Sequence, residues 1–431
     1  MDRSPAAGGA LGALGVCEIR ERCATGALTA LAVSESCLER VDAVEADVQA
    51  WTFLDRDLVR SQARALDARP ARGPLHGVPV GVKDIIDTAD MPTENGTVLH
   101  AGRRPQQDAV VVTRLREAGA VIFGKTVTTE LATYAPGKTR NPHNPAHTPG
   151  GSSSGSAAAV AAGMVPAAIG TQTNGSVIRP AAFCGVVGYK PGFGLIPRDG
   201  VLRQSPALDQ LGVFARSVED AALLAAVLCG SEAGEHLRLA TREVEQPRLA
   251  WMRTAAWPKA DADTRTAFEG FARRFSVAEL EMPASVAPAW DWQRTLMEAE
   301  IAANYAEEWA RGRDQLSASL RAQIERGLAM PAAAVAAAKA QIAVVNAAFD
   351  PLFERVDAII TPAVPGTAPQ GLDSTGDPAF CTLWTFAGMP AITLPLLSGS
   401  NGLPLGVQLV ARRGNDAALI RAAHWLFQTA R

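Results

Sequence analysis

Hydrophobic positions change their spacing several times along the chain, and each spacing predicts a kind of element. Over residues 17–68, apolar side chains recur at helical intervals. In residues 77–83, valines alternate with Pro, Gly and Lys, which is the period of a strand. Residues 111–120 predict a helix, and residues 121–125 predict a strand directly after it. A helix followed by a buried strand favours an α/β fold.

From about residue 135 to the end, predicted helices and strands alternate again, and a largely helical segment separates the strand-like runs. A loop rich in Gly, Pro, Ser and Thr precedes an Ala-rich helix, an apolar strand at 165–170 and a second loop at 171–176. Residues 232–350 are Ala-rich and are predicted to be largely helical. Strand-like runs then return from residue 356 to a terminal amphipathic helix. We therefore predict one domain over residues 1–431, with 232–350 as a helical insert.

Composition narrows the class of protein. Apolar residues make up 48% and charged residues 20%, and the net charge is −3, which is typical of a soluble globular protein. Lys and Arg are spread evenly, so no basic stripe indicates a nucleic-acid partner. The apolar stretch at 157–170 is shorter than the roughly 20 residues of a membrane span. Six scattered cysteines indicate reduced thiols, and we expect a cytoplasmic protein without a signal peptide.

One candidate for chemistry is a lysine in an apolar strand. Lys83 must there be paired, exposed at an edge, or desolvated. Desolvation lowers the pKa of a lysine, and the neutral amine is a usable base. By itself the segment favours an ordinary surface lysine beside Asp84, since most lysines are exposed.

Two further candidates are segments rich in Gly and Ser. Residues 150–160, GGSSSGSAAAV, gather hydroxyls and backbone N–H groups before a helix, where an anion or an oxyanion can bind. Residues 170–185, GTQTNGSVIRPAAFCG, place a glycine before Ser176, which allows the close backbone approach that an oxyanion hole needs. Taken singly, each segment also fits a helix cap or a tight loop.

Together the three segments resemble the amidase-signature family. Ser152 and Ser176 are 24 residues apart, and Lys83 lies 93 residues before Ser176. The resemblance covers about residues 66–228 and resumes from about 356, where GLPLGVQLVA matches the closing strand of the family. It implies an α/β fold with a large mixed β-sheet that helices cover on both faces. It also implies that the insert at 232–350 lines the substrate pocket.

The resemblance implies hydrolysis of a C–N bond through an acyl-enzyme, with no metal or cofactor. Ser176 matches the nucleophile, Ser152 the bridging serine and Lys83 the base. In the family the bridging serine follows a cis peptide bond, here Gly151–Ser152, a geometry that costs about 3 kcal/mol. The backbone N–H groups of the oxyanion hole match Thr173, Asn174 and Gly175.

Residues near this site point to a branch of the family and to departures from it. KDIIDTADMPTENG, GSVIRPA and STGDP look like the malonamidase-type branch, in which the residue matching Arg179 binds a substrate carboxylate. Arg179 equally fits a buried arginine that supports its loop. Gln172 and Asn174 stand where the family commonly has Asp and Gly, which removes a charge and adds a side chain. Small amides, ureas and carbamates, including urethane-type substrates, all remain open.

Rival hypotheses use the same residues differently. GSSSG also fits the nucleophile elbow of α/β-hydrolases, with Ser153 as nucleophile and His424 as its histidine, although a loop and not a strand precedes it. A family member could instead act as an amidotransferase subunit or as a binding protein that has lost activity. His76, His100, His143 and His147 are not spaced as a metal site. A homodimer is kept as an expectation, because it is the commonest symmetric assembly.

Overall fold

The fold is built on one large sheet. It is described from a computed structural model, which places residues 11, 13–71, 73–230, 232–242 and 245–430. Within these residues the sheet has eleven strands. The strands are β1 (Trp51–Phe53), β2 (Pro79–Lys83), β3 (Val121–Thr126), β4 (Ala167–Gln172), β5 (Val187–Lys190), β6 (Gln210–Ala215), β7 (Leu249–Met252), β8 (Ala278–Leu280), β9 (Ala358–Pro362), β10 (Ala391–Ser398) and β11 (Pro404–Val410).

The sheet is mixed, as predicted. Its strand order is β1-β3-β2-β4-β6-β5-β10-β11-β9-β7-β8. Parallel pairs join β2 to β3 and β4, and β7 to β8 and β9. The remaining neighbours are antiparallel. Strands from both ends of the chain therefore meet in one sheet, which the return of strand-like runs after residue 356 had indicated.

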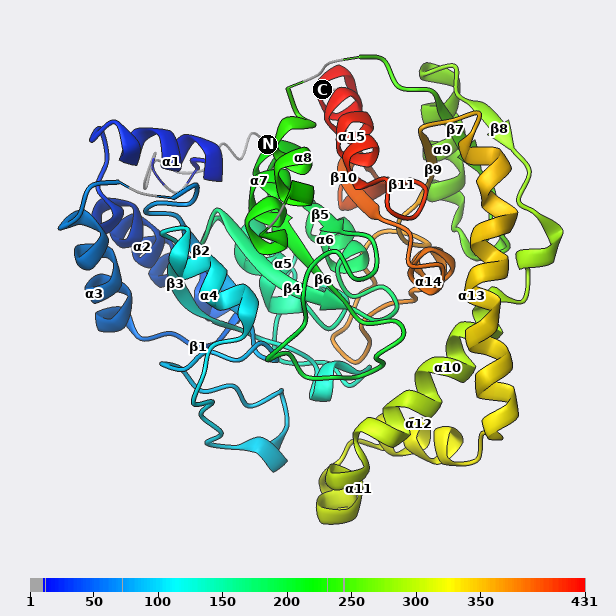
Figure 1. The fold of residues 1–431 in the computed structure, drawn as a ribbon, viewed down its shortest axis with the longest axis horizontal. Coiled ribbons are helices and arrows are strands. Elements are labelled where there is room, and N and C mark those ends of the chain that lie inside the picture. The colour runs from blue at the N-terminus through cyan, green and yellow to red at the C-terminus, as the bar shows by residue number, and fades with distance from the viewer. Residues whose placement is uncertain (1–10, 12, 72, 231, 243–244, 431) are drawn as a thin grey trace.

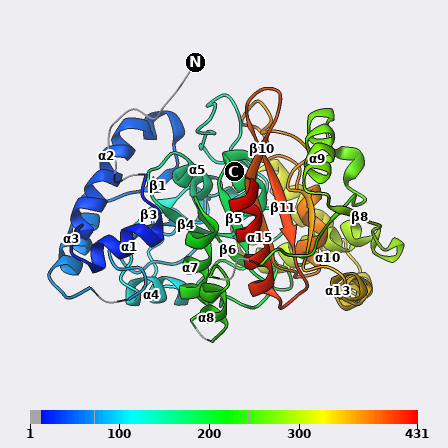
Figure 2. The same cartoon turned by 90° about the horizontal axis from the view of Figure 1, so that it is seen from above.

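Helices cover both faces of this sheet (Figures 1 and 2). Apolar side chains of α4, α7 and α15 pack on one face, and those of α2, α5 and α6 pack on the other. The helices are α1 (Val16–Ala24), α2 (Ala30–Val48), α3 (Arg56–Asp67), α4 (Val110–Glu117), α5 (Ser154–Ala161), α6 (Ile178–Cys184), α7 (Val218–Cys229), α8 (Glu232–Leu239), α9 (Ala262–Arg274), α10 (Ala289–Asn304), α11 (Ala306–Gly312), α12 (Ala318–Leu328), α13 (Ala332–Phe353), α14 (Ala379–Phe386) and α15 (Asp416–Ala430).

Two parallel strands at the centre position the candidate site. In β2, Val80 and Val82 point into the core beneath α7, so alternation sends Lys83 to the opposite side. β4 runs parallel to β2, with Val82 beside Ile169. Because the carboxyl ends of parallel neighbours lie at one edge of a sheet, Lys83 and the end of β4 are brought together.

The segment 232–350 contains more than helices. β7 pairs with β9 and β8 pairs with β7, so the segment also supplies the strands at one edge of the sheet. After these strands, α10, α12 and α13 form a second apolar core with Ile359 and Val410 of the sheet. Figure 1 shows α10 to α13 reaching away from the sheet at one side of the molecule. The segment is largely helical, and the two short strands within it were not predicted from the sequence.

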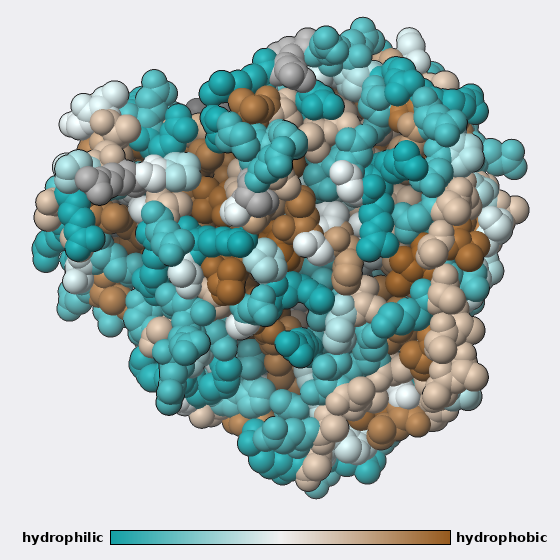
Figure 3. Space-filling view, in the orientation of Figure 1, coloured by the Kyte–Doolittle hydropathy of each residue, from teal (hydrophilic) through white to brown (hydrophobic). Residues whose placement is uncertain are grey.

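Helix α13 is apolar and largely exposed. Its 22 residues have a mean hydropathy of 1.5 over the most apolar window, of which only 17% is buried. It is the one helix in the described part of the chain that is long and apolar enough to cross a membrane, and a single such helix is weak evidence for a span. In Figure 3 a pale-brown band runs over the region where Figure 1 draws this helix. Alanines dominate α13, so its apolar character is less conspicuous in the sequence than that of residues 157–170.

A buried lysine at the end of β5 leads to a prediction about stability. Lys190 Nζ donates hydrogen bonds to Gln210 Oε1 (2.6 Å) and to the carbonyls of Met389 (2.6 Å) and Pro191 (3.1 Å). Burial lowers the pKa of Lys190 to about 7. The unfolded chain, where a lysine titrates near pH 10.4, then binds more protons than the folded chain above pH 7. Lys190 therefore makes stability rise with pH, by up to about 1.4 kcal/mol per unit.

The expected result is a urea midpoint that increases between pH 7 and 8.5 in the natural protein. Lys190→Met is expected to show a smaller increase over the same range, whatever its absolute stability. The two slopes are compared, because the substitution also leaves three acceptors without their donor. Equal slopes for the two proteins would contradict a lowered pKa at Lys190.

Candidate active site

Lys83 lies at the end of β2 and is completely buried. Its Nζ donates hydrogen bonds to Ser152 Oγ (2.7 Å) and Thr171 Oγ1 (2.8 Å). Burial lowers the pKa of Lys83 well below its usual value, and the nearby carboxylate of Asp209 acts in the opposite direction. The surface-lysine alternative is excluded, and what remains is a desolvated amine whose partners are hydroxyls.

The loop before α5 brings Ser152 to this lysine. Gly150 and Gly151 have φ values of 82° and 63°, in the left-handed region that favours glycine. At Gly151 a Cβ would lie 2.7 Å from Pro180 Cδ and 3.2 Å from Ser176 Cα, so only glycine allows this approach. The loop is fixed from outside by Gly151 N–H, which donates to the carbonyl of Thr375 (3.1 Å).

The structure corrects the predicted geometry between the two serines. No described residue follows a cis peptide bond, so the Gly151–Ser152 bond is trans. Ser176 Oγ accepts a hydrogen bond from the backbone N–H of Ser152 (3.2 Å), and not from its hydroxyl. Two successive left-handed glycines turn the chain sharply before Ser152. The predicted contact between the two hydroxyls is not among the hydrogen bonds of the described residues.

Ser176 lies in the turn between β4 and α6, with three candidate donors before it. Its side chain is nearly buried. The backbone N–H groups of Thr173, Asn174 and Gly175 donate to no acceptor within the described part of the chain. The next N–H groups, of Val177 and Ile178, are both taken by Gln172 Oε1 (2.7 and 2.9 Å). Backbone N–H groups that are free beside a serine hydroxyl can form an oxyanion hole.

The two departures from the family pattern are both built into the structure. Gln172 holds the turn after Ser176 through its carbonyl, and its Nε2 donates to Thr385 Oγ1 (2.9 Å). Asn174 Nδ2 donates to Tyr134 Oη (3.1 Å), while its Oδ1 accepts from Thr382 Oγ1 (2.8 Å). Gln172 is therefore a brace, by which we mean a neutral side chain that holds the turn carrying Ser176, the candidate nucleophile turn. Asn174 links that turn to Tyr134 and Thr382 in the wall of a neighbouring cavity.

Truncating this brace is expected to loosen the nucleophile turn. Gln172→Ala leaves two buried N–H groups without an acceptor, and we expect a loss of about 2 kcal/mol in the free energy of unfolding. Because the affected groups follow Ser176 directly, kcat should also fall at temperatures where the variant is folded. Gln408→Ala is the matched control, since Gln408 is equally buried but braces Thr361, Pro362 and Phe380. Equal kcat values for both variants would contradict a role of Gln172 at the nucleophile.

Arg179 is buried one helical turn after Ser176. Its exposed fraction is 1%, and one terminal nitrogen donates to the carbonyl of Gly376. Its Nε has no hydrogen-bond partner among the described residues. Burial lowers the pKa of Arg179, and the nearby Tyr134 acts in the opposite direction. The arginine thus supports the loop at 376, and its buried Nε remains without an acceptor within the described residues.

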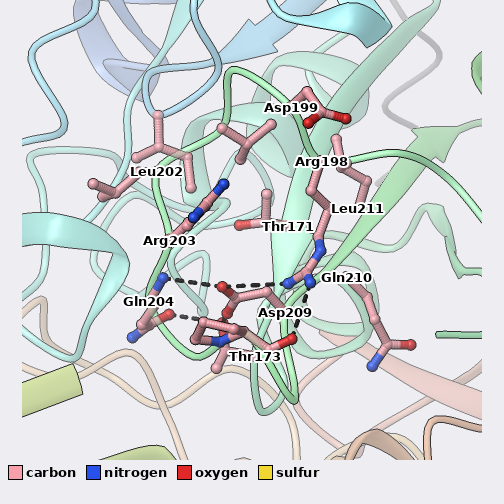
Figure 4. A pocket seen from close by; sticks show the side chains of 13 residues that line it. Thr171, Thr173, Arg198, Asp199, Leu202, Arg203, Gln204, Asp209, Gln210 and Leu211 are labelled. Carbon is pink, nitrogen blue, oxygen red and sulfur yellow. Dashed lines mark hydrogen bonds and ion pairs between the residues drawn. The ribbon is translucent and has the colours of Figure 1, made fainter. Parts of the chain in front are cut away.

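Two cavities flank the turn between β4 and α6. One, of about 260 Å³, is lined by Asn174, Tyr134 and residues of α10, including Trp290, Gln293 and Glu298. The other, also about 260 Å³, is lined by Thr171, Thr173 and the loop at 198–211 (Figure 4). Thr171 and Thr173 line one cavity and Asn174 lines the other, so we call residues 171–174 the wall between the two cavities.

The residues of the rival nucleophile elbow serve other contacts. Ser153 Oγ donates to the carbonyl of Thr171 (3.1 Å) and accepts from its N–H (3.2 Å). His424, on α15, lies 3.1 Å from Glu219 and 3.0 Å from Gln428. Ser153 and His424 therefore do not meet. Among the described residues, no three His, Cys, Asp or Glu side chains are grouped as a metal site.

Comparison with known proteins agrees with this architecture. The family model described as Amidase matches residues 32–420. The chain belongs to the amidase family. It is 33% identical to a glutamyl-tRNA(Gln) amidotransferase subunit from Roseiflexus castenholzii, over 95% of this chain and 94% of the relative. The peptide amidase of Stenotrophomonas maltophilia has a similar structure, with a TM-score of 0.81, 28% identity and 97% of each chain covered.

A further similar structure comes from a complex. It superposes with a TM-score of 0.90 and 28% identity, over 96% of this chain and 98% of the other, and is described as part of a vestigial protein complex that reveals the origins of an s-triazine catabolic enzyme. Similar proteins are thus described as a peptide amidase, as an amidotransferase subunit and as part of a complex. The fold and the C–N bond chemistry of the family follow for this chain, whereas its substrate does not.

Several residues of the site were not predicted from the sequence. Thr171 contacts Lys83, Tyr134 contacts Asn174, and Asp209 accepts from Thr173 Oγ1 (2.7 Å). Burial raises the pKa of Asp209 to about 6. Thr171 stood within the segment 170–185, but nothing in its spacing indicated Lys83 as its partner. Thr173 was predicted for its backbone N–H and not for the contact of its hydroxyl with Asp209.

Proposed function

We propose that this protein hydrolyses a small amide through an acyl-enzyme, with Ser176 as nucleophile, Ser152 as bridging serine and Lys83 as base. The observation that carries the proposal is the buried Lys83 amine, 2.7 Å from Ser152 Oγ. The loop of Ser152 in turn contacts Ser176 Oγ. A neutral amine in this place is a base without needing a histidine.

The proposed reaction has two steps, acylation and deacylation. In each step a proton moves along Ser152 to Lys83 and then returns. Lys83 takes the proton of Ser152, whose oxygen takes that of Ser176 as Ser176 Oγ bonds to the substrate carbonyl. The proton returns through Ser152 to the leaving nitrogen as the C–N bond breaks, which releases an amine and leaves an ester on Ser176. Water then repeats the path and frees the acid. The hydroxyl-to-hydroxyl contact that this path requires is expected to form with bound substrate, since catalytic hydrogen bonds often tighten there.

We place the oxyanion and the acyl group on one side of the wall formed by residues 171–174. The N–H groups of Thr173, Asn174 and Gly175 would hold the negative oxygen. The acyl group would occupy the cavity beside α10, which supports the expectation that segment 232–350 lines the substrate pocket. Trp290 and Met297 give this cavity an apolar wall, whereas Lys259 and Asp377 form an ion pair at 2.8 Å beside it.

The preferred acyl group is tested through Arg179. The likeness to the malonamidase-type branch, together with the unused Nε, supports a contact with an acyl-side carboxylate. Arg179 belongs to neither cavity lining, which instead favours loop support. Arg179→Lys keeps the charge but not the planar fork. A larger loss on a malonamate-like amide than on a neutral amide would favour the carboxylate contact, and an equal loss would favour support of the loop.

The proposed function is tested by turnover and by trapping. An aryl amide, a malonamate-like amide, a urea and an aryl carbamate, including a urethane, are offered to the purified protein. We expect turnover of at least one, and mass spectrometry after a fluorophosphonate probe should locate the adduct on Ser176. An adduct on Ser153 would instead support the nucleophile elbow. If the protein shows neither turnover nor labelling, the proposed hydrolase is rejected.

The second candidate is one component of an amidotransferase complex. Identity of 33% with a glutamyl-tRNA(Gln) amidotransferase subunit over nearly the whole of both chains favours it. Such a component should co-purify with other chains from its own cell, and should show little amide turnover without them. If the protein purifies from its own cell as a monomer or homodimer without other chains, and turns over the amide at full rate, this candidate is rejected. The proposed hydrolase is expected in the cytoplasm, bound to neither nucleic acid nor membrane. Fractionation of the same cells tests this expectation.

A further inference from the structure

The second cavity beside the turn that carries Ser176 is separated from Lys83 by one residue, Thr171. It is lined by Thr171 and Thr173 on one side and by the loop at 198–211 on the other. Thr171 Oγ1 accepts a hydrogen bond from Lys83 Nζ (2.8 Å). The cavity therefore lies one residue beyond Lys83, whose amine contacts Ser152 (2.7 Å), the serine that is proposed to return the proton to the leaving nitrogen. The acyl-side cavity borders Asn174 instead.

The polar groups of this cavity, which we name the rear cavity, are not equivalent. Asp209 is buried and already engaged by Thr173 Oγ1 (2.7 Å), by backbone N–H groups and by Arg198 (3.6 Å). Arg198 also donates to the carbonyl of Pro206 (2.9 Å). Asp199 lies on the exposed part of the loop. The formal charges of the lining cancel: Arg198 and Asp209 pair with each other, whereas Asp199 and Arg203, both exposed, form no ion pair within the described residues.

In the part of the chain that the structure describes, Arg203 is the unpaired cation of this lining, and its side chain is exposed. Its guanidinium has no hydrogen bond or ion pair within the described residues, although it lines the rear cavity. Figure 4 draws its side chain among the lining residues, with dashed lines at Arg198 and Asp209 but none at Arg203. A guanidinium presents a planar fork of donors that suits a carboxylate. The walls around it include Ile85, Leu202 and Leu211, which suit an apolar body.

We propose that the rear cavity holds the leaving amine and that Arg203 selects amines carrying a carboxylate, such as amino acids or aminobenzoates. This inference rests on the proposed function, and it names the amine half of the substrate. An amide whose nitrogen faces Lys83 and Ser152 would extend past Thr171 into the rear cavity, with its acidic group at Arg203. The acyl half would stay beside Asn174, on the other side of the wall.

The experiment uses three amides that share the acyl group preferred in the turnover test. Their leaving groups are 4-aminobenzoate, 4-aminobenzamide and aniline, so the first two differ in charge but little in shape. We expect kcat/KM to be about tenfold higher for the aminobenzoate amide than for the aminobenzamide, as one charge-assisted hydrogen bond provides. Arg203→Gln should remove this preference, mainly by raising KM for the aminobenzoate amide. Arg203→Lys should keep part of it.

Arg355→Gln is the matched control, because Arg355 is exposed and outside both cavities. It should behave like the natural protein on all three amides. Equal rates for the charged and neutral amides in the natural protein would overturn the inference, as would a preference that survives Arg203→Gln. Both outcomes leave the proposed hydrolase intact. Loss of turnover on every amide would reject the hydrolase itself, and this inference with it.

Discussion

Replacing Ser176 with alanine is expected to lower kcat for the best amide substrate by about 10⁴- to 10⁶-fold, the range seen when a nucleophilic serine is removed. The substitution deletes a hydroxyl that accepts one hydrogen bond, from Ser152 N–H. Nothing else in the turn depends on it, since Gln172 holds Val177 and Ile178. Stability should therefore change by less than about 1 kcal/mol. The check is kcat from initial rates, beside a thermal unfolding curve.

A neighbouring serine provides the control. Ser154→Ala removes a buried hydroxyl that has no partner among the described residues, so its kcat should be unchanged. Ser153→Ala tests the rival elbow. If activity survives Ser176→Ala and disappears in Ser153→Ala, the nucleophile has been assigned to the wrong serine.

Replacing Lys83 with methionine is the second large expected effect. Loss of a positioned base typically costs 10²- to 10⁴-fold in rate, and we expect kcat to fall by about that factor. Methionine has a similar length and fits a buried site, but it cannot take a proton. Because burial lowers the pKa of Lys83 well below its usual value, the amine is neutral above that lowered pKa. Activity of the natural protein should therefore increase as pH rises through it, and Lys83→Met should lack this rise.

Another buried lysine separates this effect from burial in general. Lys190 is also completely buried, but its partners are carbonyls and Gln210, not the candidate serines. Lys190→Met should keep the increase of activity with pH even where its stability differs. If Lys83→Met retained both its rate and the shape of its pH profile, Lys83 would not be the base.

The sequence allowed the sheet to be predicted where alternation is long enough to see. Val80 and Val82 indicated β2, and residues 121–125 indicated β3, which the structure confirms as Val121–Thr126. β1 and β8 have three residues each and β7 has four. Runs this short carry no readable period. Their pairing depends on neighbours from distant parts of the chain, and they were missed.

The same limit applies to the candidate site. Lys83, Ser152 and Ser176 could be named because each stands in a motif, and the structure brings them together. Thr171 could not, because its contact with Lys83 arises only when β2 and β4 lie side by side. The trans bond before Ser152 was missed because the resemblance supplied a geometry that the local glycines make unnecessary. Gln172 was judged by its missing charge, whereas its position as a brace depends on the turn that it holds.

The two halves of the candidate site come from different stretches of the chain. Lys83, Ser152, Ser176 and the brace at Gln172 lie within about a hundred consecutive residues, whereas Trp290, Gln293 and Glu298 on α10 shape the cavity beside Asn174. Inheritance can therefore act on these stretches separately. With the acyl group in its proposed position beside α10, exchanging α10 for that of a relative would change which acyl group is preferred. The residues proposed for catalysis would stay the same. Within one family, reaction type should persist over longer lineages than the choice of substrate does.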